Sequence, residues 1–353
     1  MPGNDSTAII VAVISLASSV SVAVFAYVNS QRLQKLNSAQ EEKLTRINNV
    51  NSQELEKLKK KLGDEKSEQD ARRDYEYEAK KRLYQEYEPL LFQFNELSES
   101  AYRRIIGVAK NIKYGNLTPS NGWLGTINGY YMVNTLYRFL APLAIFRLMQ
   151  RRLTLFDLNL NPMFSTQYLL AKILYRTFSK DFVLSRMNPR LNYDPYSQKH
   201  VDRKNYPEKY QLQGVYLGKV DNMADALIKE EADKTLRIMS FGEFQREYFK
   251  TDVVHEIFKD ISNLFFNFHP NSSPVLWRIL ITQARIYRAI LDSYKLKGSD
   301  NRSILVQMSG KERNQFNWFE YKNDKELKIM ESNYMAAEKY LQDGFTGSFE
   351  SLE

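Results

Sequence analysis

The most apolar part of the chain is the stretch from Ala8 to Val28, which contains no charged residue, no proline and no glycine. At about 1.5 Å per residue, a helix of this stretch is about 31 Å long, close to the thickness of the hydrocarbon core of a bilayer. The pattern therefore predicts a transmembrane helix over residues 8–28, with residues 1–7 as a short extracytoplasmic tail.

Two other interpretations of the same stretch stay open. A secretory signal peptide begins with a positively charged region, whereas the residues before Ala8 carry only Asp5 as a charged side chain. Val24, Phe25 and Ala26 nevertheless fit a signal-peptidase site. A buried core helix is the other interpretation, and the length of the apolar run argues against it.

Basic residues around this stretch predict its direction in the membrane. No Lys or Arg precedes it, whereas Arg32, Lys35, Lys43 and Arg46 follow it closely. Because positive residues stay on the cytoplasmic side, we expect the N-terminus outside the cell membrane and everything after the span in the cytosol.

Small residues inside the stretch form two pairs with a spacing of four positions. These pairs are Ser15 with Ser19 and Ala17 with Ser21. Such pairs allow two helices to approach closely in lipid, so we predict that these residues form a contact between transmembrane helices. Ordinary helix composition explains the same pattern equally well, and the sequence does not separate the two explanations.

Beyond the span, apolar residues recur with a period of eleven. A pair of apolar residues three positions apart occurs three times, each time shifted by eleven positions. This period corresponds to about 3.67 residues per turn, which gives a straight or slightly right-handed coiled coil. The predicted seam consists of Leu33, Leu36, Leu44, Ile47, Asn51, Leu55, Leu58 and Leu62. We assign residues 29–82 to this coiled-coil stalk, in which the polar Asn51 helps to fix the register at a cost in stability.

One apolar seam on an otherwise charged helix cannot bury itself. We expect it to pack against the same helix of another copy, in parallel, because all copies enter the same membrane. The alternative is a single helix that folds onto its own domain. The predicted partners are therefore membrane lipid and further copies of the chain, and the number of copies stays open because this repeat suits dimers, trimers and tetramers.

The hydrophobic pattern changes again at Gly63 and Asp64, where a charged stretch begins. From Leu83 to Ile112 apolar residues return at helical spacing, and Pro89 is expected to kink or restart this helix. We take this as the start of a cytosolic helical domain, assigned to residues 83–353. The change in pattern thus separates a stalk from a packed domain.

The rest of the chain predicts an all-α domain. Residues 114–128 are rich in Gly, Asn, Pro and Ser and predict a loop. Hydrophobic periodicity predicts one helix or a pair of helices over residues 164–187, a short strand or turn at 213–220, and a connection at 303–315. Further helices are expected at 130–152, 222–234, 242–268, 275–297 and 320–342. The predicted fold is therefore an N-terminal transmembrane helix, a long coiled-coil helix with an eleven-residue repeat, and a C-terminal helical domain.

Two groups of basic residues suggest anion binding. The segment 188–211 combines prolines with tyrosines and basic residues, among them Lys199, Arg203 and Lys204. Tyrosines among basic residues are typical of nucleic-acid or phosphate sites, and a long loop of this kind is also typical of a mobile surface linker. Arg278 and Arg285 lie seven positions apart on one face of a predicted helix. They form either an anion-binding pair or ion pairs with carboxylates of the domain.

The amino-acid composition excludes several kinds of functional site. The chain has 50 Lys and Arg against 42 Asp and Glu, so its surface is mixed, and its formal charge of +8 does not by itself argue for a nucleic-acid partner. It has no Cys, which excludes disulfides, thiolate catalysis and Cys-containing metal sites. His255 and Glu256 lack the second His of a zinc protease, because position 259 is Lys. We therefore predict no catalytic residue, no metal and no cofactor.

Three hypotheses of function remain. The first is a single-pass, membrane-anchored interaction or scaffold protein that oligomerises through its stalk and presents a cytosolic helical domain to a protein partner. The second is a membrane effector of a bacterial stress or phage-defence system, whose cytosolic domain senses a signal and whose transmembrane helices cluster. The third is an enzyme without short motifs, or a nucleic-acid-binding domain.

Overall fold

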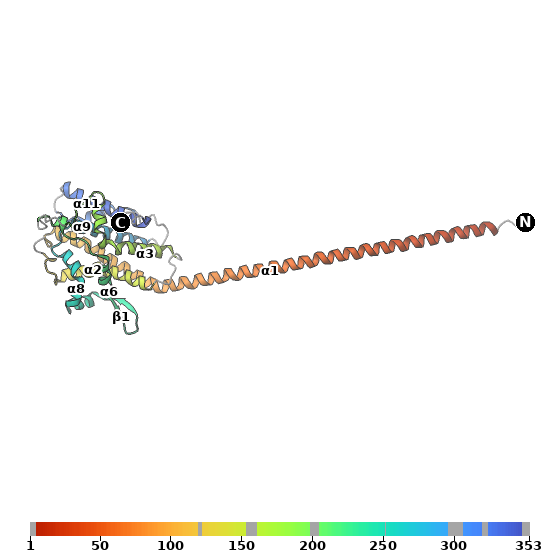
Figure 1. The fold of residues 1–353 in the computed structure, drawn as a ribbon, viewed down its shortest axis with the longest axis horizontal. Helices are drawn as coiled ribbons and strands as arrows, with labels where there is room; N and C mark the ends of the chain where they lie inside the picture. The colour runs from red at the N-terminus through yellow and green to blue at the C-terminus, as the bar shows by residue number, and fades with distance from the viewer. Residues whose placement is uncertain are drawn as a thin grey trace. The chain divides into compact units, whose positions relative to one another are not determined.

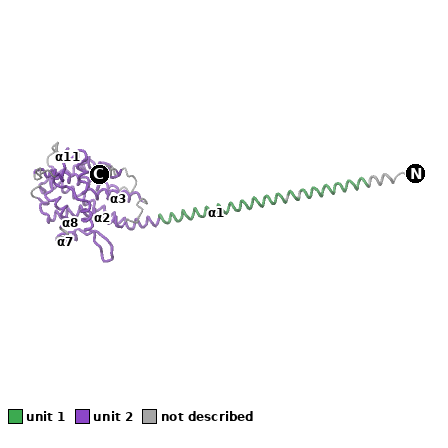
Figure 2. The backbone as a smooth tube through the Cα atoms, in the orientation of Figure 1, with its two compact units in different colours: residues 1–76 green, residues 77–353 purple. Residues whose placement is uncertain are grey.

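A computed structural model of the chain describes residues 5–118, 122–152, 161–197, 205–250, 252–295, 306–319 and 324–347. It divides into two units, residues 1–76 and residues 77–353 (Figure 2). The predicted all-α class is confirmed, because the described residues are mostly helical and their strands form one two-stranded hairpin.

The N-terminal helix α1 (Asp5–Lys113) supplies the described residues of the first unit and the first helix of the second (Figure 1). The expected restart at Pro89 is wrong, because α1 continues through this residue. Proline inside a helix costs about 3 kcal/mol. Tyr87, Leu90 and Leu91 next to Pro89 are buried in the core, and their burial offsets this cost.

One helix among the described residues is long and apolar enough to cross a membrane, judged by length and composition alone. This helix is α1 over Val13–Lys113, and no part of its apolar window is buried within the structure.

The second unit contains the remaining helices. They are α2 (Tyr130–Arg152), α3 (Pro162–Tyr175), α4 (Asp181–Arg186), α5 (Pro207–Tyr210), α6 (Leu217–Ala226), α7 (Phe241–Lys250), α8 (Asp252–Phe265), α9 (Pro274–Lys295), α10 (Gly310–Arg313) and α11 (Asp324–Thr346). Short 3-10 turns lie at Thr177–Ser179 and Asn314–Phe316. The predicted helix over 130–152 is confirmed in full, and the predicted pair over 164–187 corresponds to α3 and α4.

Two predicted helices in the middle of the domain need correction. The helix predicted over 222–234 is confirmed only as far as Ala226, where α6 ends. The antiparallel strands β1 (Ile228–Glu230) and β2 (Leu236–Ile238) follow in place of the rest. The Asp233 side chain accepts hydrogen bonds from the backbone N–H and hydroxyl of Thr235, which stabilises a turn in place of a helix. The helix predicted over 242–268 is two helices, α7 and α8.

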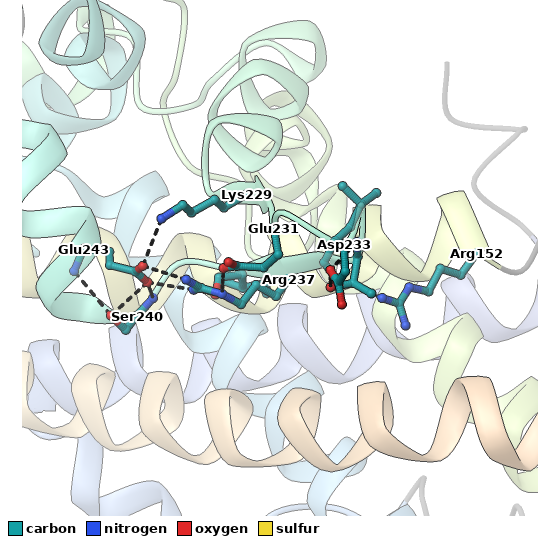
Figure 3. Close-up of polar contacts among 10 residues, drawn as sticks. Arg152, Lys229, Glu231, Asp233, Arg237, Ser240 and Glu243 are labelled. Atoms are coloured by element: carbon teal, nitrogen blue, oxygen red, sulfur yellow. Dashed lines mark hydrogen bonds and ion pairs between the residues drawn. The ribbon is translucent and has the colours of Figure 1, made fainter.

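An ion-pair network fixes this hairpin to the start of α7 (Figure 3). The guanidinium of Arg237 donates to both carboxylate oxygens of Glu243 at 2.7 Å and also contacts Glu231. These contacts hold the pKa of Glu243 well below its usual range, chiefly through Arg237. The backbone N–H of Ser240 donates to Glu243 at 2.9 Å and completes a capping box. Arg152 of α2 donates to the carbonyl of Leu236 at 2.8 Å and ties the hairpin to the helical core.

Helix α9 lies at the centre of the packing in the second unit, since it packs against α3, α4 and α11. Its Trp277 is fully buried and meets Trp318 edge-on, with ring centroids 5.5 Å apart. The part of α1 that belongs to this unit joins the same core. Its Tyr87 ring packs against the ring of Phe164 in α3, with ring centroids 4.9 Å apart. Leu184 of α4 and Met187 just after it are buried in the same core.

Candidate functional site

The predicted stalk seam is an exposed apolar row on α1. Six leucine and isoleucine side chains of the seam are described, and each is 53% to 64% exposed, whereas such residues are usually buried. They are Leu36, Leu44, Ile47, Leu55, Leu58 and Leu62. Asn51 is also exposed, and the side chain of Leu33 lies outside the described part of the chain. No described element of the same chain covers the seam.

The small residues in the apolar stretch have their polar groups satisfied within the helix. The Ser19 hydroxyl donates to the carbonyl of Ser15 at 2.9 Å, and that of Ser21 to the carbonyl of Ala17 at 2.5 Å. Hydroxyls bonded to the preceding turn add no unsatisfied donor to an apolar surface. The two pairs lie on roughly opposite sides of the helix, because residues two positions apart are about 200° apart around its axis, and all four residues are exposed.

A cavity of about 430 Å³ in the second unit is the strongest candidate for a ligand site. It lies where α4 begins and where residues 212–217 cross it. Its lining residues are Arg176, Ser179, Lys180, Asp181, Phe182, Tyr196, Leu212, Gly214, Val215, Tyr216 and Leu217. We call it the Asp181 pocket.

The pocket is named after a buried carboxylate. Asp181 is only 6% exposed, and its Oδ2 accepts a hydrogen bond of 2.6 Å from the hydroxyl of Tyr193. Burial raises the pKa of Asp181, while the Tyr193 hydroxyl and nearby backbone N–H groups favour its ionised form. No described Lys, Arg or His forms an ion pair with it. A buried carboxylate without a cation is unusual in a structural role.

Aromatic rings form one wall of the Asp181 pocket. The rings of Phe182 and Tyr196 stack at 5.5 Å with an interplanar angle of 18°. The hydroxyls of Tyr196 and Tyr216 touch, and this hydrogen bond raises the pKa of Tyr196 to about 12. Both tyrosines are nonetheless more than half exposed. The cavity therefore combines flat, accessible rings with a buried acceptor, and the cations of Arg176 and Lys180 also line it.

Gly214 lies so close to the carboxyl group of Asp181 that a residue with a side chain does not fit at this position. A Cβ added at Gly214 would lie 2.5 Å from the carboxyl carbon of Asp181 and 2.7 Å from its Oδ1. Any side chain at this position would displace the carboxylate. The chain thus brings residue 214 against residue 181 through a contact that only glycine permits.

Two buried polar side chains attach this region to the core. Gln213, 1% exposed, accepts hydrogen bonds from the backbone N–H groups of Val275 and Leu276 in the first turn of α9, at 2.8 and 3.2 Å. Its amide donates to the carbonyl of Glu208 at 3.0 Å. The Tyr193 hydroxyl that bonds Asp181 also accepts from the backbone N–H of Gln213 at 3.0 Å. The pocket wall is therefore built on α9.

Arg278 is the second attachment and one of the residues predicted to bind an anion. All five N–H groups of its guanidinium are used. They donate to the carbonyls of Leu184, Met187 and Pro189, to Oδ1 of Asn333 and to Oγ of Ser332, at 2.9 to 3.3 Å. Arg278 is fully buried, and burial lowers its pKa to about 10, so it stays charged at neutral pH. It has no donor left for an anion.

The other predicted anion-binding residues lie elsewhere. Arg285 is fully buried and donates to Glu338 at 2.8 Å, so the alternative of pairing with a domain carboxylate describes it. Lys199, Arg203 and Lys204 lie outside the described residues. We therefore do not propose Arg278 and Arg285 as an anion site.

The helix face around His255 gives no site either. The side chain of His255 lies outside the described residues, and Glu256 pairs with Lys259 at 3.1 Å. Within the described ranges, no group of three or more His, Asp or Glu side chains is placed to hold a metal ion.

A second groove of about 430 Å³ lies between α1 and α2. Arg104 and Arg138 both donate there to Oδ1 of Asn134, and burial together with the charge of Arg104 lowers the pKa of Arg138. Glu96 and Glu99 line the same groove, so its charge is mixed.

Sequence patterns singled out part of the Asp181 pocket. The segment 188–211, with its tyrosines and basic residues, contains Tyr193 and Tyr196. Asp181 and Gly214 were missed, since one lies within a predicted helix pair and the other within a segment expected to be a strand or turn. The signal that points to them is spatial, namely the contact of residues 181 and 214.

Comparisons with protein-family models, curated proteins and solved structures find no match for this chain. Function is therefore argued from the chain itself.

Proposed function

We propose that the protein is a single-pass membrane protein that oligomerises through the seam on α1 and presents its helical domain to a cytosolic protein partner. The observation that carries this proposal is the exposed apolar surface of α1, which extends from Val13 to Leu62 and which no described element covers. Burial of such surface is the dominant favourable term in both membrane insertion and association.

The two parts of this surface call for different partners. Between Val13 and Val28 the apolar side chains point in all directions around the helix, as expected for a helix surrounded by lipid. Beyond Val28 the apolar residues follow one narrow row among charged residues, as expected for a helix that packs against a few other helices. Lipid for the first part and further copies of the chain for the second account for both.

The seam makes a direct prediction for assembly. The double variant Ile47→Lys/Leu58→Lys places two charges in the seam, and we expect it to be a monomer, because the charges cannot be buried between helices. Mass photometry of the purified chain in detergent, supported by chemical crosslinking in membranes, measures the copy number. The same experiment on the unchanged chain is expected to give a dimer or a larger oligomer.

The matched control is Asn49→Lys/Gln53→Lys, which adds the same charge on the opposite face of α1, where both residues are exposed. This control is expected to keep the oligomer. A monomeric unchanged chain, or equal dissociation in both double variants, would contradict assembly through the seam.

Anchoring and direction are tested with single cysteines, since the chain contains none. In intact cells, a membrane-impermeant maleimide is expected to label Asn4→Cys, whereas Ser67→Cys is expected to react only after lysis. Both variants should remain in the membrane fraction at alkaline pH. Loss of the Asn4→Cys tail from the mature chain would instead identify a cleaved signal peptide, and labelling of Ser67→Cys in intact cells would reverse the proposed orientation.

The partner of the domain is identified by crosslinking the intact chain in membranes and recovering what copurifies after detergent extraction. We expect a cytosolic protein whose recovery falls in the monomeric seam variant, because an oligomer binds with several domains at once. Recovery that is equal for both would separate partner binding from assembly.

A further inference from the structure

We propose that the groove between α1 and α2 binds the phosphate group of a small phosphorylated ligand, held between Arg104 and Arg138. Both arginines line this groove. Its other lining residues lie between Glu96 and Gly107 of α1, so the site belongs wholly to the second unit. Binding at this groove therefore does not depend on the proposed assembly through the seam.

The two arginines share one neutral acceptor. Nη2 of Arg104 and Nε of Arg138 both donate to Oδ1 of Asn134, the second at 2.8 Å. Each guanidinium has five N–H donors, and within the described residues each uses only this one in a hydrogen bond. Both side chains are half-buried. Donors on both guanidiniums are therefore available to a ligand in the groove.

No described carboxylate balances the two positive charges. Neither Arg104 nor Arg138 forms an ion pair with an Asp or Glu in the described part of the chain. Arg147, which also lies partly buried on α2, pairs with Asp225 at 3.1 Å. Burial, and then the charge of Arg104, lower the pKa of Arg138, as expected for a cation beside a like charge. An anion in the groove supplies the missing negative charge.

The acidic residues of the groove do not take this place. Glu99 is paired with Arg103, at 2.5 Å. Glu96 lies eight positions before Arg104 on α1, which corresponds to about 12 Å along the helix axis. The groove therefore has an acidic end and an arginine end, and the arginine end is the one without a counter-ion.

The Asp181 pocket is better enclosed than this groove, but its polar groups are already engaged. Oδ2 of Asp181 accepts from the Tyr193 hydroxyl, and a Cβ at Gly214 would lie 2.7 Å from Oδ1. The arginine pair thus offers what that pocket lacks, namely charged groups whose hydrogen-bonding capacity the protein does not use.

A phosphate group suits two guanidiniums better than a carboxylate does. The planar fork of arginine matches the geometry of phosphate oxygens. A phosphate monoester carries a charge of about −1.5 to −2 at neutral pH and has three strong acceptor oxygens, so it can accept from both arginines and balance both charges. A carboxylate has one charge and two oxygens. The groove of about 430 Å³ also has room for the small molecule that carries the phosphate, since small-molecule sites measure about 300–1,000 Å³.

The test uses the full chain in micelles of a nonionic detergent and isothermal titration calorimetry with glycerol 3-phosphate. We expect saturable binding, at least about tenfold tighter than that of acetate, which brings one charge instead of two. Glycerol is expected to give no measurable binding, because it lacks the phosphate. A phosphoserine-containing peptide is expected to bind no tighter than glycerol 3-phosphate.

The decisive variant is Asn134→Asp, which keeps the shape of the side chain and places a carboxylate between the two arginines. We expect glycerol 3-phosphate binding to weaken about tenfold or more, because the new carboxylate takes the place of the ligand's charge. The melting temperature of the ligand-free variant is expected to rise, because both arginines gain a counter-ion. A loss of binding in a more stable protein is not explained by a fault in folding.

The arginines themselves are tested with matched controls. Arg104→Gln and Arg138→Gln are each expected to weaken binding about tenfold or more. The double variant Glu99→Gln/Arg103→Gln removes a paired acid and base from the same groove without changing its net charge. Arg190→Gln removes one exposed positive charge elsewhere on the second unit and controls for general attraction of anions. Both controls are expected to bind as the unchanged chain does.

Several results would overturn the proposal. They are the absence of saturable glycerol 3-phosphate binding, equal binding of acetate, tighter binding of the phosphopeptide, and equal losses in the arginine variants and their controls. An Asn134→Asp variant that binds glycerol 3-phosphate as tightly as the unchanged chain would do so too. All variants are compared at a temperature at which circular dichroism shows them to be fully folded.

Discussion

Replacement of Arg278 by leucine is expected to lower the free energy of unfolding of the helical domain by about 3–5 kcal/mol. Five acceptors lose their donor at once, and three of them are backbone carbonyls between residues 184 and 189. The site is fully buried, so water cannot replace the lost hydrogen bonds. At about 2–4 °C per kcal/mol, the melting temperature should fall by about 6 °C or more.

The control for this effect is Arg288→Leu, about three helical turns further along α9. Arg288 pairs with Asp292 and Glu312 at 2.9 and 3.1 Å, but its side chain is 35% exposed. Ion pairs at such positions contribute about 0–1 kcal/mol, so little change is expected. Differential scanning calorimetry of both variants makes the comparison. Equal losses would show that the five hydrogen bonds of Arg278 contribute no more than a surface pair.

A lysine at position 278 refines the result. Arg278→Lys retains the charge but offers three donors instead of five and lacks the planar fork. We expect it to lose most of the stability that the leucine variant loses. A lysine variant as stable as the unchanged chain would mean that the charge alone, rather than the set of hydrogen bonds, holds the segment.

The helices of the domain could largely be predicted, because their hydrophobic pattern is strong. The helix α2 is an apolar run that follows a loop and closes on Arg151 and Arg152, and its predicted bounds agree with the structure. The hairpin after α6 could not be predicted in this way. Its turn depends on the bond between Asp233 and Thr235, a local interaction that competes with helix and leaves no periodic pattern.

The binding partners of the two buried arginines of α9 could not be predicted from the sequence, for a different reason. Arg278 and Arg285 have the same residue type and share a helix face, yet one bonds to neutral acceptors and the other to Glu338. Which acceptors surround a buried cation is decided by segments that are distant along the chain, 21 positions away for Val306 and more than 50 for Asn333 and Glu338. Spacing along one helix therefore predicts that such residues are special, but not what they bind.

The Asp181 pocket could be predicted only in part, for the same reason. The tyrosine-rich segment drew attention to Tyr193 and Tyr196, whereas the burial of Asp181 results from the approach of Gly214 and from attachment to α9. The seam on α1 is the opposite case. Its pattern is evident along the sequence, while its predicted partner lies outside a single chain, so assembly stays a proposal that only a measurement of copy number can decide.

Gln213→Leu is expected to destabilise the domain by about 2–4 kcal/mol and to loosen the pocket wall at the same time. Gln213 satisfies two of the first N–H groups of α9 and the carbonyl of Glu208, and leucine, which has a similar volume, satisfies none. Hydrogen exchange should accelerate at the amides of Val275 and Leu276. The nearby Gln211→Leu is the control, because its side chain is exposed and little change is expected.

Arg278 and Gln213 both attach the region of the Asp181 pocket to α9, the first as a hydrogen-bond donor and the second as an acceptor. Arg278 donates to carbonyls in the last turn of α4 and just after it, and Gln213, next to Gly214, accepts from α9. Loss of the Gln213 contacts should therefore also accelerate hydrogen exchange at the backbone N–H of residue 213, which donates to the Tyr193 hydroxyl, measured at a temperature where the variant is fully folded. Unchanged exchange at residue 213 together with faster exchange in α9 would mean that the carboxylate and its glycine hold each other in place without support from the core.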